Sequence, residues 1–199
     1  MNKITIYYLN TEDIKNNEEY IISSISKERL EKANKHIIHD DYLLSIGGSY
    51  LIYQHLGEKT IHLTKNGKPY MDNVYFSISH SKEMVAIAIS DKPIGLDIEY
   101  IRPLLMDITS TIATKEEQES IHNNEDLFKL WCLKESLSKC IGIGLNQGVK
   151  NLTAKEGIYQ YNDKIYVGKT TTYNGYQIAV TIKDDTEIEL ELNHEIIAK

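Results

Sequence analysis

Two carboxylates stand two residues apart in the run Asp97-Ile98-Glu99. The apolar and β-branched residues before and between them predict a strand, and residues two apart in a strand face the same side. Asp97 and Glu99 would then lie together, where their negative charges repel each other unless a cation lies between them. Oxygen ligands suit Mg²⁺, so the pair is a candidate metal site. The alternative is two exposed acids at the end of a strand.

A second charged pair, Glu135 and Lys139, follows Trp131 in a segment that predicts a long helix from Asp126 to about Ile141. Residues four apart on a helix share a face. One interpretation is an ordinary surface salt bridge. The other is a third carboxylate for a metal ion, with a lysine one turn away that binds a phosphate.

Two further segments carry polar groups suited to phosphate binding, Ser77-Ile78-Ser79-His80-Ser81 and Gly67-Lys68-Pro69. Strand alternation sends Ser77 and Ser79 to one face, and no Gly-x-Ser-x-Gly elbow indicates a serine hydrolase. A structural turn and an exposed loop lysine are the alternatives for these two segments.

The elements that must position these residues are short strands and amphipathic helices. Helical spacing predicts helices over 18–35 and 40–56, and three strand-like runs (74–79, 84–90 and 94–100) with short polar breaks predict a meander of hairpins. The end of the chain is rich in strand patterns from 157 to 192. We therefore expect an α+β fold of two similar α/β halves, residues 1–102 and 103–199, each with helices packed on a mainly antiparallel sheet.

Composition limits the classes of function. The 199 residues include 22 Lys and Arg against 29 Asp and Glu, a formal net charge of −7. This balance argues against nucleic-acid binding, and an anionic ligand would need a local group of cations. No run approaches 18 apolar residues, so we expect no membrane span. The cysteines, Cys132 and Cys140, would lie too far apart on one helix for a disulfide, which favours a reducing, cytoplasmic location.

Taken in order along the chain, four motifs resemble those of the 4′-phosphopantetheinyl transferases, in the longer pseudo-dimeric class associated with peptide and polyketide synthetases and secondary metabolite biosynthesis. They are Gly67-Lys68-Pro69, Phe76–Ser81, Gly95-Leu96-Asp97-Ile98-Glu99 and Trp131-x-x-Lys134-Glu135-Ser136-x-x-Lys139. The resemblance covers about residues 26–145. It implies two similar halves with the active site at their junction. It also implies Mg²⁺-dependent transfer of phosphopantetheine from coenzyme A to a serine of a carrier protein, which leaves adenosine 3′,5′-bisphosphate.

By this resemblance each candidate residue receives a role. Three carboxylates would hold Mg²⁺, or Mn²⁺ in its place: Asp97, Glu99 and Glu135. Six residues would bind coenzyme A, mainly at its phosphates: Arg29, Lys32, Lys68, Ser79, His80 and Lys139. The catalytic residues would be Glu135, Lys139 and Glu117, the last as the base that accepts the serine proton, with the adjacent Glu116 as an alternative.

One departure from the family concerns the first half. The family often shows Arg-x-x-Asp-x-x-Arg-x-x-x-Gly, of which Asp41 and Gly48 are present, whereas Ile38 and Leu44 stand in place of the two arginines. A bidentate phosphate contact is thereby lost. We expect weaker affinity for coenzyme A, or compensation by His39, Lys35 or another cation.

Two other classes of function stay open at this point. Asp-x-Glu with a further Glu and Lys can form the site of a metal-dependent nuclease or phosphodiesterase. A non-catalytic module that binds coenzyme A or a carrier protein is the other. For the transferase, the expected partner is an apo acyl or peptidyl carrier protein, with no nucleic acid or membrane involved, and the expected state is a monomer.

Overall fold

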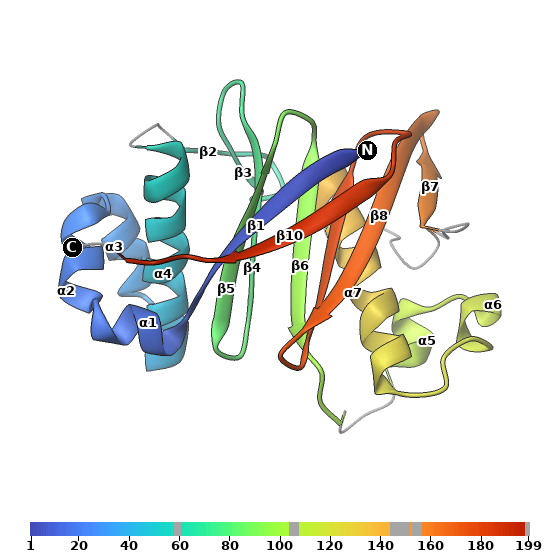
Figure 1. Ribbon diagram of the computed structural model, residues 1–199, viewed down its shortest axis with the longest axis horizontal. Coiled ribbons are helices and arrows are strands. Elements are labelled where there is room, and N and C mark those ends of the chain that lie inside the picture. Colours follow the sequence, from blue (N-terminus) through green and yellow to red (C-terminus); the bar gives the residue numbers. More distant parts are fainter. Residues whose placement is uncertain (58–60, 104–107, 144–151, 153–156, 198–199) are drawn as a thin grey trace.

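The computed structural model describes residues 1–57, 61–103, 108–143, 152 and 157–197. These residues form two four-stranded sheets that pack face to face, with helices on both outer sides (Figure 1). The helices are α1 (Thr11–Asn16), α2 (Glu18–Ser24), α3 (Lys27–Ala33), α4 (His39–Leu56), α5 (Thr109–Ile112), α6 (Lys115–Gln118) and α7 (Asn124–Ile141). The predicted α+β class is confirmed, and the pseudo-duplication of the halves stays a prediction.

The first sheet has the strand order β10-β1-β5-β4, and the second has the order β6-β9-β8-β7. The pair β1 and β10 is parallel, and the other pairs in the two sheets are antiparallel. A two-stranded hairpin, β2 with β3, lies outside them. The strands are β1 (Asn2–Asn10), β2 (His62–Leu63), β3 (Pro69–Tyr70), β4 (Tyr75–Ser81), β5 (Met84–Ser90), β6 (Ile94–Tyr100), β7 (Ile158–Tyr161), β8 (Lys164–Tyr173), β9 (Tyr176–Ile182) and β10 (Ile188–His194).

The predicted meander of three strands is wrong at its third strand. Strands β4 and β5 do form a hairpin, but β6 pairs with β9 in the second sheet. Strand β10 likewise returns to the first sheet. Strand periodicity reports which side of a strand is apolar and does not report which strand lies beside it. The predicted division into halves at residue 102 stays a prediction. Each sheet takes strands from both sides of that residue.

Apolar side chains fill three cores. The first lies between the first sheet and α1 to α4, the second lies between the two sheets, and the third lies between the second sheet and α7. The helix predicted over 40–56 forms as α4, but it is buried around most of its circumference and is not amphipathic. The shorter helices α1, α2 and α3 cover the side of α4 that faces away from the sheet, which explains the difference.

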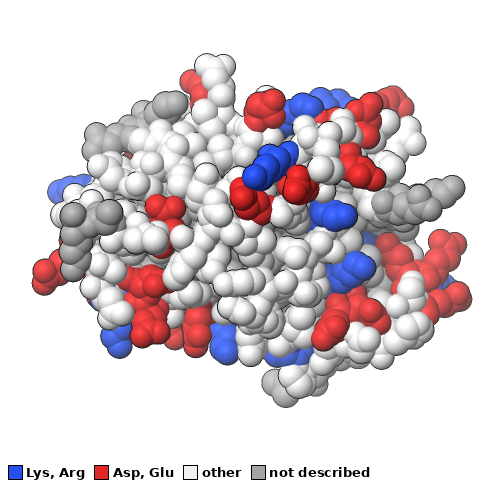
Figure 2. Space-filling view, viewed as in Figure 1, with Lys and Arg blue, Asp and Glu red and all other residues white. Residues whose placement is uncertain are grey.

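Two surface properties bear on the expected partners. Among the described residues no helix is both long enough and apolar enough to cross a membrane. On the face shown in Figure 2, Lys and Arg side chains are interspersed with Asp and Glu, and the described part of this face has no continuous basic area.

Candidate active site

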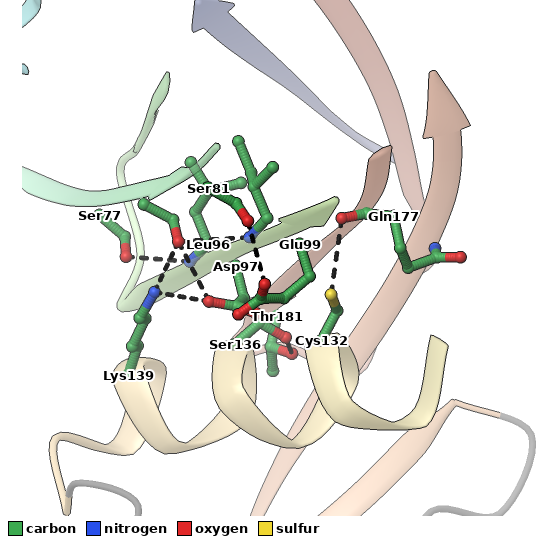
Figure 3. A network of polar contacts seen from close by, with 12 residues as sticks. Ser77, Ser81, Leu96, Asp97, Glu99, Cys132, Ser136, Lys139, Gln177 and Thr181 are labelled. Atoms are coloured by element: carbon green, nitrogen blue, oxygen red, sulfur yellow. Dashed lines mark hydrogen bonds and ion pairs between the residues drawn. The ribbon is translucent and has the colours of Figure 1, made fainter. Parts of the chain in front are cut away.

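A row of serines joins the two sheets where β4 lies beside β6. The hydroxyls of Ser77, Ser79 and Ser81 accept hydrogen bonds from the backbone N–H groups of Leu96, Ile98 and Tyr100, at 2.9, 3.2 and 3.1 Å. These side chains thus do for β6 what a backbone ladder does within a sheet. The alternation Ser-x-Ser-x-Ser is therefore explained first as a structural join (Figure 3).

Helix α7 packs directly on one face of the same strand because β6 contains Gly95. A Cβ atom at Gly95 would lie 1.9 Å from the Ser136 carbonyl oxygen and 2.5 Å from the Cys140 backbone nitrogen. No side chain fits in that space, so the glycine sets the distance between helix and strand. A hydrogen bond of 2.7 Å between the Ser136 and Thr181 hydroxyls also ties α7 to β9.

The close approach brings the two predicted pairs of charges together. The Lys139 ammonium lies 2.7 Å from Asp97 Oδ1 and donates to the Ser79 hydroxyl at 2.9 Å, and that hydroxyl donates to Asp97 Oδ1 at 3.1 Å. The other carboxylate oxygen, Asp97 Oδ2, is buried and has no hydrogen-bond partner. A buried carboxylate oxygen without a partner is costly, and a bound cation would satisfy it.

The carboxylates of Glu99 and Glu135 lie close enough to Asp97 to affect each other. Burial and the negative charge of Asp97 raise the pKa of Glu99, and the same two causes raise the pKa of Glu135 to about 7. The predicted meeting of strand and helix acids therefore occurs in the structure. The three side chains offer only carboxylate oxygens as metal ligands, and a hard divalent cation would relieve the repulsion between their negative charges. These residues therefore fit Mg²⁺.

The residue types fit a divalent cation, but their side chains are not arranged as a complete coordination site. Across the described ranges, no group of three or more His, Cys, Asp or Glu side chains has the arrangement of a complete metal site. The assignment of Asp97, Glu99 and Glu135 as metal ligands stays a prediction.

The hydroxyl of Ser79 is fully used within the protein. It accepts from Ile98 N–H and from the Lys139 ammonium, and it donates to Asp97. A hydroxyl has one proton and two lone pairs, so a contact of Ser79 with coenzyme A would have to replace one of these bonds. Its predicted role in binding coenzyme A stays a prediction.

His80 lies on β4, and Arg29 lies on α3, where it contacts α4. Partial desolvation and the Lys139 ammonium lower the pKa of His80, whose other charged neighbours include His36 and Asp41. Arg29 donates to the Ser49 hydroxyl on α4 at 3.4 Å, and burial lowers the pKa of its guanidinium. Lys32, one turn further along α3, is exposed. His36 lies close enough to His80 to affect its pKa, although the sequence did not assign it to the site.

Lys68 ties the β2–β3 segment to both elements of the site. Its ammonium donates to the Ile94 carbonyl at 3.2 Å and to the Cys140 carbonyl, in the last turn of α7, at 3.5 Å. Burial lowers the pKa of Lys68. In this arrangement the lysine satisfies carbonyl groups at the C-terminal end of a helix. Its role with a phosphate stays a prediction.

Glu117 is held by a partner that the sequence did not reveal. Its Oε2 accepts from the Lys134 ammonium at 2.5 Å and from the Thr114 backbone N–H at 2.8 Å, in a capping box at the start of α6. Lys134 is 2% exposed and also donates to the Ile112 carbonyl. The alternative base, Glu116, is exposed. Only the apolar surroundings of Lys134 in its motif could have indicated that this lysine is buried.

The structure shows how the departure in the first half is accommodated. Leu44 is 3% exposed and belongs to the core between the first sheet and the helices, whereas Ile38 is 61% exposed at the start of α4. An arginine at position 44 would bring a charge into this core, so the leucine is part of the packing of α4. Lys35 and His39 are both exposed. Their compensating role stays a prediction.

Comparison with known proteins agrees with this geometry. Residues 93–189 match the family model described as the 4′-phosphopantetheinyl transferase superfamily. The chain is 29% identical to 4′-phosphopantetheinyl transferase gsp of Aneurinibacillus migulanus over 180 residues, which covers 79% of this chain and 76% of that protein. It is 30% identical to 4′-phosphopantetheinyl transferase psf-1 of Bacillus pumilus, over 61% of this chain and 52% of that protein.

A third relative, 4′-phosphopantetheinyl transferase Sfp of Bacillus subtilis strain 168, is 30% identical over 64% of this chain and 65% of its own length. These relatives are all named as transferases, which supports a transferase of substituted phosphate groups. The family match and these named relatives support a 4′-phosphopantetheinyl transferase of the Sfp-like class. The predicted resemblance is thereby confirmed.

Proposed function

We propose that this protein transfers 4′-phosphopantetheine from coenzyme A to a serine of an apo acyl or peptidyl carrier protein, in the presence of Mg²⁺ or Mn²⁺. The observation that supports this most directly is the meeting of three acids and one lysine at the contact of β6 with α7, where Asp97 Oδ2 is buried without a partner. The match to the superfamily model and the similarity to relatives named 4′-phosphopantetheinyl transferases support the same reaction.

Asp97, Glu99 and Glu135 would hold the cation. Bound there, it would neutralise their repulsion and polarise the phosphoryl group under attack. Lys139, which lies at 2.7 Å from Asp97 Oδ1, would add positive charge beside the pyrophosphate of coenzyme A. Arg29, Lys32, Lys68 and His80 would supply the further local positive charge that a chain with a net charge of −7 needs for so anionic a ligand.

The nucleophile is the serine hydroxyl of the carrier protein. Its oxygen forms a bond to the phosphorus that carries the pantetheine group, and the bond from this phosphorus to the bridging oxygen breaks. The bridging oxygen leaves as part of adenosine 3′,5′-bisphosphate. Glu117 would accept the serine proton, and the Lys134 ammonium at 2.5 Å would fix the orientation of its carboxylate.

The test mixes the pure protein with coenzyme A, Mg²⁺ and a panel of apo carrier proteins, and weighs the intact carriers by mass spectrometry. We expect a gain of one phosphopantetheine group, which is lost with EDTA and with a Ser→Ala change in the carrier. The panel would also show which carrier is preferred.

Two outcomes would contradict the proposal. No gain on any carrier, with coenzyme A binding still measurable, would indicate a binding module. Cleavage of a plasmid in Mg²⁺ by the purified protein, lost in a Glu135→Gln variant, would indicate a phosphodiesterase. The cytoplasmic location and the monomeric state are further parts of the proposal, which cell fractionation and light scattering would test.

A further inference from the structure

The serine row has a regular relation to the acids of β6. Ser79 donates to Asp97, and Ser81 donates to Glu99, so each serine bonds the carboxylate 18 residues further along the chain. The same spacing from Ser77 leads to Gly95, which has no side chain. The three serines therefore share one structural role toward the β6 backbone, and two of them have a second role toward a carboxylate.

We propose that Ser81 is a positioning residue for Glu99, and that its hydroxyl fixes this carboxylate as a ligand for the divalent cation. This inference rests on the proposed function. Ser81 donates to Glu99 Oε2 at 3.0 Å and accepts from the Tyr100 backbone N–H at 3.1 Å, so its own orientation is set by the strand that carries Glu99. Ser81 is 9% exposed, which protects both bonds from water.

Glu99 needs such a partner because Asp97 repels its carboxylate and its side chain is partly exposed. Its carboxylate is repelled by Asp97, and its side chain retains 20% exposure, so rotation toward solvent is open to it. The other partner of Oε2, Arg102 at 3.6 Å, has a side chain that is 49% exposed. An exposed ion pair of this length holds a side chain weakly, so the buried hydroxyl is the contact that defines the position of Glu99.

The role of Ser81 differs from that of Ser79. The Ser79 hydroxyl bonds Asp97 and Lys139 together, and Lys139 is itself placed in the binding machinery. Ser81 donates to Glu99 and accepts from the Tyr100 backbone, and neither of these bonds involves Lys139. A change at Ser81 therefore tests the orientation of a metal ligand with little effect on the phosphate-binding lysine.

The test compares Ser81→Ala with Ser77→Ala in the full chain. Both variants remove one hydroxyl that accepts from the β6 backbone, but only the first removes a bond to a carboxylate. Mn²⁺ binding is measured by electron paramagnetic resonance, with coenzyme A present and no carrier protein. Partners of metal ligands typically contribute 10- to 100-fold to metal affinity, so we expect Ser81→Ala to raise the Kd for Mn²⁺ about tenfold.

We expect Ser77→Ala to leave this Kd unchanged, Ser81→Thr to restore it, and saturating Mn²⁺ to return kcat of Ser81→Ala to near the wild-type value. If Ser81→Ala does not fold, Ser81→Cys keeps a side chain of similar size with a weaker donor and should shift the Kd in the same direction. Equal shifts in Ser81→Ala and Ser77→Ala, or no shift in either, would overturn the inference.

The experiment separates this inference from the proposed function. A wild-type protein that binds Mn²⁺ but modifies no carrier would overturn the proposed transfer, while a Kd shift confined to the Ser81 variants would still support the positioning role. A wild-type protein that binds no Mn²⁺ with coenzyme A present would overturn both.

Discussion

Helices α4 and α7 each have 18 residues and each cover the outer face of a four-stranded sheet, yet they bury different chemistry. The buried side of α4 is apolar apart from Ser49 and its two glycines. The buried side of α7 includes four polar or charged residues: Lys134, Glu135, Ser136 and Ser138. The close approach to the sheet is also made differently, by Gly48 in the helix at α4 and by Gly95 in the strand at α7.

This contrast shows where the fold accepts a cost in stability. Buried charges are unfavourable unless they are paired, and the acids at α7 exceed the cations that contact them closely. The α4 interface has the composition of an ordinary core. The α7 interface keeps groups that repel each other, and such conflicts are expected at sites that bind a ligand.

The largest effect should come from Gly95→Ala. The new Cβ would meet backbone atoms of α7 at 1.9 and 2.5 Å, so the helix would have to move as a unit. We expect a loss of about 3 kcal/mol in the free energy of unfolding, at the upper end for overpacking, together with loss of transfer activity. Urea unfolding and the carrier mass assay measure the two effects.

Gly48→Ala on α4 is the matched control. Its Cβ would lie 3.3 Å from a Val85 methyl group, a side-chain contact that a shift of a few tenths of an ångström would relieve. Alanine also favours a helix over glycine by about 1 kcal/mol, so the net change should stay within about 1 kcal/mol. Equal losses in the two variants would remove the contrast between the two interfaces.

Glu135→Gln should separate function from stability at α7. It keeps the shape of the side chain and removes a charge that Asp97 repels. Because even outer partners of a metal contribute 10- to 100-fold, we expect transfer to fall at least about 100-fold. The urea midpoint in EDTA should be unchanged or higher. The control is Glu125→Gln, on the exposed start of the same helix, which should behave as wild type. Wild-type turnover in Glu135→Gln would show that Glu135 is not part of the site.

A smaller effect is expected from Lys139→Met, which should strengthen metal binding. Its ammonium contacts Asp97 and so competes with a cation for this carboxylate. Two charges about 4 Å apart near a protein surface repel by up to about 4 kcal/mol, and the lysine can swing away, so Mn²⁺ should bind about tenfold more tightly without coenzyme A.

Transfer by Lys139→Met should nevertheless fall, because the phosphate loses a partner. Lys129→Met, at an exposed position of α7, is the control for the loss of one positive charge. Weaker Mn²⁺ binding in Lys139→Met than in the control would show that the lysine supports the metal site and does not compete for it.

Much of this arrangement was predictable because it depends on local periodicity. The strand around Asp97 forms as predicted. The helix predicted from Asp126 to about Ile141 also forms, but it begins two residues earlier, at Asn124, with Asn123 as its N-cap. The ion pair of Lys134 with Glu117 and the bonds of Ser81 were not predicted. Each joins elements whose relative placement depends on packing and not on neighbouring residues.

Local sequence is enough to predict that Asp97 and Glu99 share a side of a strand and that Glu135 and Lys139 share a side of a helix, since the repeats of 2 and 3.6 residues are properties of the local backbone. That these two sides face each other depends on tertiary packing. It requires that β6 pairs with β9 and not with β5, and that Gly95 has no side chain, so that α7 can pack against β6. The burial of apolar surface from distant parts of the chain selects among such pairings, and it is non-directional, so no local pattern specifies the outcome.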